Sequence, residues 1–120
     1  MIVNDIIHEA IRLRASDIHF EPFEKEMIVR FRIDGVLHEM GVIPKDRVPE
    51  IISRIKILSN MNIAEKRRAQ DGKIRISGQG RDVDIRVSTL PTGFGEKAVL
   101  RLLDKSNYSI TLDSIGMDSE

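Results

Sequence analysis

The stretch MIVRFRIDGVLHEMGVI, residues 27–43, decides the fold of this chain because it reads as two strands joined by a tight turn. Apolar side chains alternate with polar ones in its first half: Val29, Phe31 and Ile33 against Arg30 and Arg32. This period of two predicts a strand with one buried face. Asp34-Gly35 is typical of a two-residue hairpin turn, so residues 36–43 are expected to form the return strand.

The same alternation predicts strands on both sides of this hairpin. One runs from Asp17 to Pro22, where proline ends the pattern. After Gly72 the alternation resumes through Ile74 and Ile76, and then through residues 83–87. SGQG, residues 77–80, is expected to be the connection between these two strands. A last strand is expected after the TGFG turn, residues 92–95.

Two segments have the period of a helix instead. Apolar side chains in residues 2–11 fall on one helical face. Pro49 fits the first turn of a second helix, which carries Ile51, Ile52, Ile55 and Leu58 and is expected to end near Asn60 or Asn62. The order helix, three strands, helix, three strands predicts an α/β (α+β) fold, with a largely antiparallel sheet of about six strands and two main helices packed on it.

Composition sets limits on the function. The chain has 120 residues, which indicates one domain, and 19 basic residues balance 19 acidic ones. Neutrality does not favour a nucleic-acid or membrane partner, although local basic patches are compatible with it. There is no cysteine, no signal peptide pattern and no run long enough to span a bilayer. We therefore expect a soluble, cytoplasmic domain without direct membrane insertion.

The segment PTGFGEKAVLRLLDK, residues 91–105, looks at first like a phosphate-binding loop. Such a loop needs a glycine, four residues and then Gly-Lys-Ser/Thr. Here Glu96 separates Gly95 from the lysine, Ala98 follows the lysine, and Leu90 occupies the place of the first glycine. A carboxylate at Glu96 would also repel phosphate. The segment is therefore predicted to be a turn before the last strand, without a nucleotide.

Four stretches together carry a resemblance to a known family: ASDIHFEP (15–22), VRFRIDGVLHEM (29–40), RIKILSNMNIAEKRRAQDGKI (54–74) and DVDIRVSTLPTGFGEKAVLRLLDK (82–105). In this order they resemble the type II secretion and type IV pilus assembly ATPases. The resemblance implies that residues 1–105 form the PAS-like second N-terminal domain of such an ATPase. Residues 106–120 then look like the linker toward a RecA-like catalytic domain.

The resemblance also implies a set of partners. The family's Walker A and B motifs and its aspartate and histidine boxes lie beyond these stretches, so the chain alone is not expected to hydrolyse ATP or to hold a cofactor. ATP and Mg²⁺ are expected in the full-length parent. Its partners would be the catalytic domain, neighbouring subunits of a hexamer, and platform proteins of the inner membrane, at whose cytoplasmic face the parent would work. The secretion and pilus branches share these motifs, so the resemblance fits both.

Two arginines receive a role from the resemblance. Arg86 in DIRVST and Arg101 in VLRLLDK match family arginines that contact the nucleotide phosphates when this domain closes over the catalytic domain. A guanidinium suits that role because it is permanently charged and binds phosphate oxygens in pairs. Arg101 also interrupts an apolar strand, which would be costly in a purely structural role. From the residues alone, cross-strand ion pairs remain an alternative for both arginines.

Other polar residues have structural explanations in the sequence. Salt bridges are predicted for Arg30, Arg32 and Arg75. Asp17 and Glu21 are interpreted as turn and pairing residues, and His19 as a strand residue with a local hydrogen bond. The histidines, at positions 8, 19 and 38, are too far apart in sequence to predict a zinc site. EKRRAQDGK, residues 65–73, is either an exposed loop or a contact surface for a neighbouring subunit.

Two other function classes remain open. A free-standing PAS-like sensor would need a cavity with converging polar groups, whereas the inward positions are mostly aliphatic with no clear buried polar candidate. A nucleic-acid-binding module would need stacking aromatics, but the aromatic residues fit core or turn positions, and the net charge is zero.

Overall fold

The Asp34-Gly35 turn forms as predicted and sets the geometry of the first hairpin. In the computed structural model, which describes residues 2–78 and 81–104, both turn residues have positive φ, 52° and 80°. These values belong to the type I′ turn, whose twist matches that of the flanking strands. The turn joins β2 (Glu26–Ile33) to β3 (Val36–Pro44). Strand β1 (Asp17–Pro22) pairs antiparallel with the other edge of β2.

The second half of the chain repeats this organisation. Strands β4 (Gln70–Gly78), β5 (Arg81–Thr92) and β6 (Gly95–Asp104) form an antiparallel meander. The β5–β6 turn contains Gly93 and Phe94, so the segment 92–95 is a turn as predicted. β4 begins two residues before Gly72, earlier than its alternation indicated. The SGQG connection falls partly on residues 79–80, outside the described ranges, and so does the predicted linker at 106–120.

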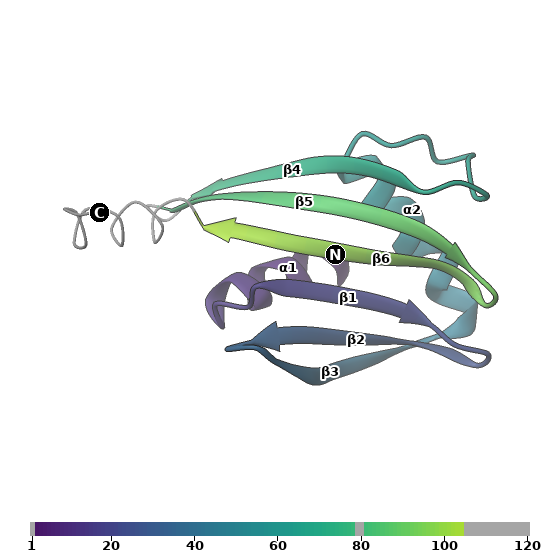
Figure 1. Cartoon of the computed structure of the whole chain (residues 1–120), viewed down its shortest axis with the longest axis horizontal. Helices are drawn as coiled ribbons and strands as arrows, with labels where there is room; N and C mark the ends of the chain where they lie inside the picture. The colour runs from purple at the N-terminus through teal and green to yellow at the C-terminus, as the bar shows by residue number, and fades with distance from the viewer. Residues whose placement is uncertain (1, 79–80, 105–120) are drawn as a thin grey trace.

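One long-range pairing unites the two halves. β1 and β6 lie side by side in the middle of the sheet, antiparallel, which gives the strand order β3-β2-β1-β6-β5-β4 (Figure 1). The result is a six-stranded antiparallel sheet with two helices, α1 (Ile2–Arg12) and α2 (Val48–Leu58), and a short 3₁₀ turn, η1 (Lys45–Arg47), before α2. This confirms the predicted α+β fold and its element order. The PAS-like character stays a prediction.

Both helices cover the same face of the sheet, and the core fills the space between them and the strands (Figure 1). The alternation in each strand decides which side chains face the helices. The largest fully buried apolar side chains come from every layer: Ile7 of α1, Ile55 of α2, and Ile18, Phe20, Met27, Phe31, Ile85 and Leu100 of the sheet. The opposite face of the sheet, here called the outer face, carries no helix of the described residues.

Two residues after each helix, one residue adopts the left-handed conformation. Arg14 (φ 59°) follows α1, and Ala15 N–H donates to the Ala10 carbonyl at 2.9 Å. Asn60 (φ 65°) follows α2, and Met61 N–H donates to the Lys56 carbonyl at 2.8 Å. Asparagine tolerates this conformation, so α2 ends two residues before Asn60, close to the predicted position.

Candidate functional site

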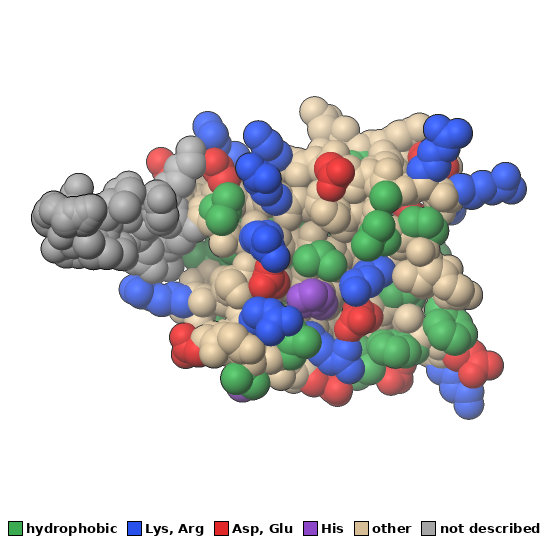
Figure 2. Space-filling model, in the orientation of Figure 1, with side chains coloured by type: hydrophobic (Ala, Val, Ile, Leu, Met, Phe, Trp, Pro, Cys, Tyr) green, Lys and Arg blue, Asp and Glu red, His purple; other side chains and the backbone are tan. Residues whose placement is uncertain are grey.

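A row of charged side chains crosses the outer face of the sheet. The strand registers pair Lys73 with Arg86, Arg86 with Arg101, Arg101 with Asp17, and Asp17 with Arg32. We call these five residues the charged row. Because directly opposed residues on neighbouring strands point to the same face, all five belong to the outer face. Figure 2 views this face, where blue side chains follow one another across the strands with a red one among them. The row contains four cations and one carboxylate.

Asp17 is the carboxylate of the row, and it serves two arginines. Its side chain is only 8% exposed, and its Oδ1 accepts a hydrogen bond from Arg101 Nε at 3.1 Å. Arg32 Nε lies 3.5 Å from Oδ2, which also accepts from the Ser16 hydroxyl at 3.0 Å. The interpretation of Asp17 as a pairing residue is confirmed. Arg101, although paired, keeps 68% of its side chain exposed.

That exposure corrects one expectation about Arg101. The apolar neighbours of Arg101 in sequence suggested that the guanidinium interrupts a buried strand at a desolvation cost. In the structure only one side of β6 is buried, so Leu100 packs in the core while Arg101 projects from the outer face. No burial cost arises at this position. The ion-pair alternative does apply to Arg101, through Asp17.

Arg86 differs from its neighbour in this respect. It is exposed on β5, and within residues 2–78 and 81–104 its guanidinium forms no ion pair or side-chain hydrogen bond. Asp84, two residues away, instead accepts from Arg75 Nε at 2.9 Å. Arg86 therefore stands between Lys73 and Arg101 without a carboxylate of its own. Like charges directly opposed across strands are destabilising, so this arrangement works against the stability of the fold.

The three arginines for which salt bridges were predicted all form them. Arg30 forms an ion pair with Glu21, Arg32 with Asp17, and Arg75 with Asp84. Lys97 Nζ lies 3.8 Å from Glu21 as well. These contacts give Arg30, Arg32 and Arg75 structural roles on the outer face, which leaves Arg86 and Lys73 as the uncompensated cations of the charged row.

His19 lies on the outer face next to the charged row. Its pKa is lowered, mainly by partial burial and also by the cations of Lys97 and Arg32, while Asp17 and Glu21 oppose the shift. A lowered pKa keeps the imidazole neutral at pH 7, so His19 adds no charge to this face. The expected local hydrogen bond is not seen: in the described part of the chain, the imidazole has no hydrogen-bond partner.

A hollow of about 660 Å³ lies over the uncompensated end of the row. Lys73, Arg86 and Arg101 line it together with Asp71, Ser88 and Val99. Asp71 is the acidic residue among the described lining residues, and its carboxylate accepts a hydrogen bond from the Ser88 hydroxyl at 2.9 Å. Three cations against one carboxylate make this hollow suited to an anion with several charged oxygens.

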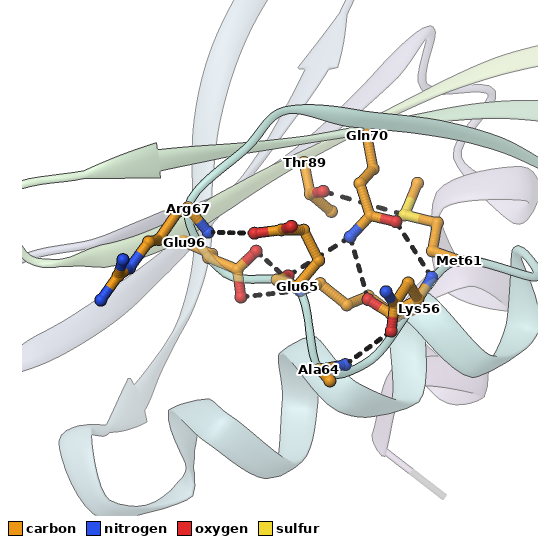
Figure 3. Close-up of polar contacts among 9 residues, drawn as sticks. Lys56, Met61, Ala64, Glu65, Arg67, Gln70, Thr89 and Glu96 are labelled. Carbon is orange, nitrogen blue, oxygen red and sulfur yellow. Dashed lines mark hydrogen bonds and ion pairs between the residues drawn. The ribbon is translucent and has the colours of Figure 1, made fainter.

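A second polar cluster lies on the helix side, and the sequence analysis missed it. Lys56 of α2 is 1% exposed, and its Nζ contacts Glu96 Oε1 at 2.9 Å and Oε2 at 2.7 Å (Figure 3). The same ammonium donates to the Glu65 carbonyl at 2.6 Å. The expectation of no clear buried polar candidate is therefore wrong. The sequence did contain a sign that Lys56 is buried, because Ile52, Lys56 and Ser59 follow the spacing of the buried face of α2.

The ion pair of Lys56 and Glu96 also bears on the segment 91–105, which resembled a phosphate-binding loop. Glu96 is directed into the protein toward Lys56, while Lys97 lies on the outer face near Glu21. Alternation along β6 separates these two residues to opposite faces. The predicted turn is confirmed, and Glu96 and Lys97 point to opposite faces; the absence of a nucleotide there stays a prediction.

Among residues 2–78 and 81–104, no three His, Asp or Glu side chains lie close enough together to hold a metal ion. Within the same ranges, neither helix has the length and apolar content needed to cross a bilayer. Of the predicted loop 65–73, residues 65–69 are largely exposed without regular structure, whereas residues 70–73 belong to β4; a contact surface for a neighbouring subunit stays a prediction.

Comparison with known proteins places the chain in a family. The family model described as Type II/IV secretion system protein matches residues 1–120. Type II secretion system protein E of Pseudomonas aeruginosa is 52% identical over 116 residues, 97% of this chain and 23% of that protein. Type II secretion system protein E of Aeromonas hydrophila is 50% identical over the same length and shares. Type IV pilus assembly ATPase PilB of Myxococcus xanthus is 50% identical over 120 residues, 99% of this chain and 21% of that protein.

The chain thus spans less than a quarter of the length of these relatives. The strands and helices described above, the outer face and the charged row all fall within the matched residues. The match is high along nearly the whole chain and to both the secretion and the pilus branch, and it confirms the resemblance seen in the sequence. The chain belongs to the type II/IV secretion system protein family.

Proposed function

We propose that this chain is a regulatory and assembly domain of a longer secretion or pilus-assembly ATPase. In this proposal it closes over a nucleotide held by a RecA-like catalytic domain, and Arg86 and Arg101 contact the ATP phosphates. One observation carries the proposal most strongly. Arg86 is exposed beside Arg101 on the uncovered face of the sheet and has no carboxylate partner among the described residues.

The electrostatics of the outer face support this role. Two guanidinium groups directly opposed on β5 and β6 repel each other, and only Arg101 has a compensating carboxylate. Such a cost is typical of functional sites, where a local rule is broken because a ligand supplies the missing interaction. A phosphate chain would offer several oxygens to both guanidinium groups and neutralise charge that develops during phosphoryl transfer.

The metal ion that accompanies ATP does not fit the hollow on the outer face. Lys73, Arg86 and Arg101 would repel Mg²⁺, and Asp71 is the one carboxylate of the lining. In the proposal Mg²⁺ is therefore held by the catalytic domain, and this chain alone does not hydrolyse ATP. Neighbouring subunits of a hexamer and inner-membrane platform proteins would be the partners of the whole ATPase, at the cytoplasmic face of the membrane.

The alternative functions have weaker support. A ligand sensor would need free polar groups in a cavity, and a pocket of about 300 Å³ beside α2 is lined by Lys56 and Glu96, but these two groups contact each other. For a nucleic-acid reader, aromatic platforms would be needed on the outer face. Phe20 and Phe31 are buried, and Phe23 and Phe94 are exposed at the end of β1 and in the β5–β6 turn.

ATP hydrolysis by the full-length ATPase tests the proposal. Arg86→Ala and Arg101→Ala should each lower kcat by at least about tenfold, the scale of losing one cation that stabilises a phosphoryl transition state. Arg75→Ala is the matched control, because Arg75 lies on the same face but is already paired with Asp84. It should keep near-normal activity.

The 120-residue chain supplies the stability control. Arg86→Ala in this chain should change the free energy of unfolding by less than about 1 kcal/mol, because an exposed residue without a partner contributes little. If hydrolysis survives in both variants, or if the chain unfolds as activity falls, the arginines do not act on a nucleotide and the proposal is wrong.

A further inference from the structure

We infer that Lys73 is a third phosphate-binding residue of the outer face, beside Arg86 and Arg101. The inference deepens the proposed function and rests on it for the identity of the phosphate chain as that of a nucleotide. It begins from the register of the sheet, which places Lys73 directly opposite Arg86 as Arg86 lies opposite Arg101. All three side chains line the same hollow.

The position of Lys73 is fixed from the other side of the sheet. Its neighbour Gly72 lies so close to the end of α2 that an added Cβ would overlap the backbone carbonyl oxygen of Ser59. This close approach holds β4 against α2 at that point. Because alternate residues of a strand face opposite sides, Lys73 is directed to the outer face, away from the helices. It is exposed there.

Comparison with Arg75 separates Lys73 from an ordinary surface cation. Both residues lie on β4 and on the outer face, two positions apart. Arg75 is paired with Asp84 across the strand. Lys73 faces Arg86 instead, and in the part of the chain that the structure describes its ammonium has no acidic or hydrogen-bonding partner. The sheet thus compensates one cation and leaves its neighbour available.

The geometry of the three cations suits a polyphosphate. Neighbouring strands lie about 4.7 to 4.9 Å apart, so the three side chains start from points spread over about 10 Å. Two guanidinium forks and one compact ammonium can then bind successive phosphate groups of a flexible, multiply charged chain. The carboxylate of Asp71 offsets at most one of the three positive charges, so the described lining keeps a net positive charge. A single small anion would satisfy fewer of them.

Titration of the 120-residue chain with sodium tripolyphosphate tests this inference. Binding is measured from the shifts of the protein's NMR signals. Signals of Lys73, Arg86 and Arg101 should shift together. Lys73→Gln should weaken binding by about three- to tenfold, the effect of one exposed charge, and should melt like the wild-type chain. Lys73→Arg should keep the affinity. Arg75→Gln is the matched control and should bind like the wild type.

Several outcomes would overturn the inference. One is that Lys73→Gln binds tripolyphosphate as tightly as the wild type. Another is that Arg75→Gln weakens binding as much as Lys73→Gln does, because binding would then depend only on the general positive charge of the face. A wild-type chain that binds no tripolyphosphate at about 10 mM would also overturn it. So would tighter binding of a poly-glutamate peptide of equal charge, because the site would then fit an acidic protein segment better than phosphate.

Hydrolysis by the full-length ATPase distinguishes this inference from the proposed function. If Arg86→Ala and Arg101→Ala lower kcat but Lys73→Gln changes neither kcat nor KM, the inference fails and the proposed function stands. If the chain binds tripolyphosphate through Lys73 while the arginine variants hydrolyse ATP normally, the phosphate site stands and closure over the nucleotide fails. A fall in all three variants supports both.

Discussion

Lys56 and Glu96 form a buried ion pair whose desolvation cost has to be offset by its contacts. Moving two charged groups out of water is expensive, and their mutual attraction repays this only with good geometry. Here Lys56 Nζ contacts both carboxylate oxygens and also donates to the Glu65 carbonyl. These contacts tie α2 to the start of β6 and to the segment after α2 (Figure 3). The arrangement therefore depends on all its partners.

Removing one partner of this pair should be far more harmful than removing both. Lys56→Met is expected to lower the free energy of unfolding by about 3 to 5 kcal/mol, because Glu96 is left charged and buried. Adding Glu96→Leu should recover most of that loss. Urea denaturation of the two single variants, the double variant and the wild type measures the coupling between the sites.

The surface pair of Arg12 and Glu9 provides the matched control. Arg12 Nη2 and Glu9 Oε2 lie 2.5 Å apart, but both side chains are exposed. Arg12→Met should therefore leave the denaturation midpoint almost unchanged. Additive effects of Lys56→Met and Glu96→Leu would contradict the account of the buried pair, since independent sites show no coupling.

At the scale of single residues, the sequence predicted that most arginines of the sheet would form ion pairs, but not whether Arg86 or Arg101 would have a carboxylate partner. It predicted salt bridges for Arg30, Arg32 and Arg75, and all three form. It left Arg86 and Arg101 open, because which arginine meets a carboxylate depends on register. Lys56 was missed because its partner is 40 residues away. A lysine on the apolar face of α2 was the one available sign.

At the scale of helices and strands, the close contact between α2 and β4 depends on Gly72. An added Cβ at Gly72 would overlap the Ser59 carbonyl oxygen and lie 3.0 Å from the Ser59 Cβ. Ser59 is fixed in turn, since its backbone N–H and its hydroxyl both donate to the Ile55 carbonyl. Ile55 is fully buried. The end of α2 therefore cannot move away from β4 without disturbing the core.

Gly72→Ala should accordingly destabilise the chain by about 1 to 3 kcal/mol, the usual cost of overpacking a tight contact. Gly41→Ala is the matched control, because Gly41 also lies in a strand but has nothing near its missing side chain. Thermal unfolding of both variants measures the difference. Equal melting of Gly72→Ala and the wild type would show that α2 and β4 are not in tight contact.

The elements themselves were largely predictable because their signals are local. Alternation marks the strands, and Asp34-Gly35 and Asn60 mark a turn and a helix end through their tolerance of positive φ. The pairing of β1 with β6 is different. It brings Asp17 next to Arg101 across 84 residues, and neither strand carries a sequence signal that predicts the other as its partner. The charged row exists only through that pairing, so it could not be read from the sequence.

At the scale of the whole molecule, the two faces of the sheet differ in what they contact and in their charge. One face holds both helices and the core, while the outer face presents paired charges with an uncompensated group at Lys73 and Arg86 (Figures 1 and 2). Val99 lies on β6 opposite Ser88, two residues before Arg101, and lines the hollow with these cations. In the proposed closure the outer face meets the nucleotide and the catalytic domain, so a change in its middle should act without disturbing the core.

Val99→Glu in the full-length ATPase tests which face closes over the nucleotide. The new carboxylate would pair with the nearby arginines and repel phosphate, so ATP hydrolysis should fall by at least about tenfold. Ile57→Glu is the matched control, because Ile57 is 52% exposed on α2, on the helix side of the sheet. It should hydrolyse ATP nearly normally. If instead Ile57→Glu loses activity and Val99→Glu keeps it, the helix side is the surface that meets the catalytic domain.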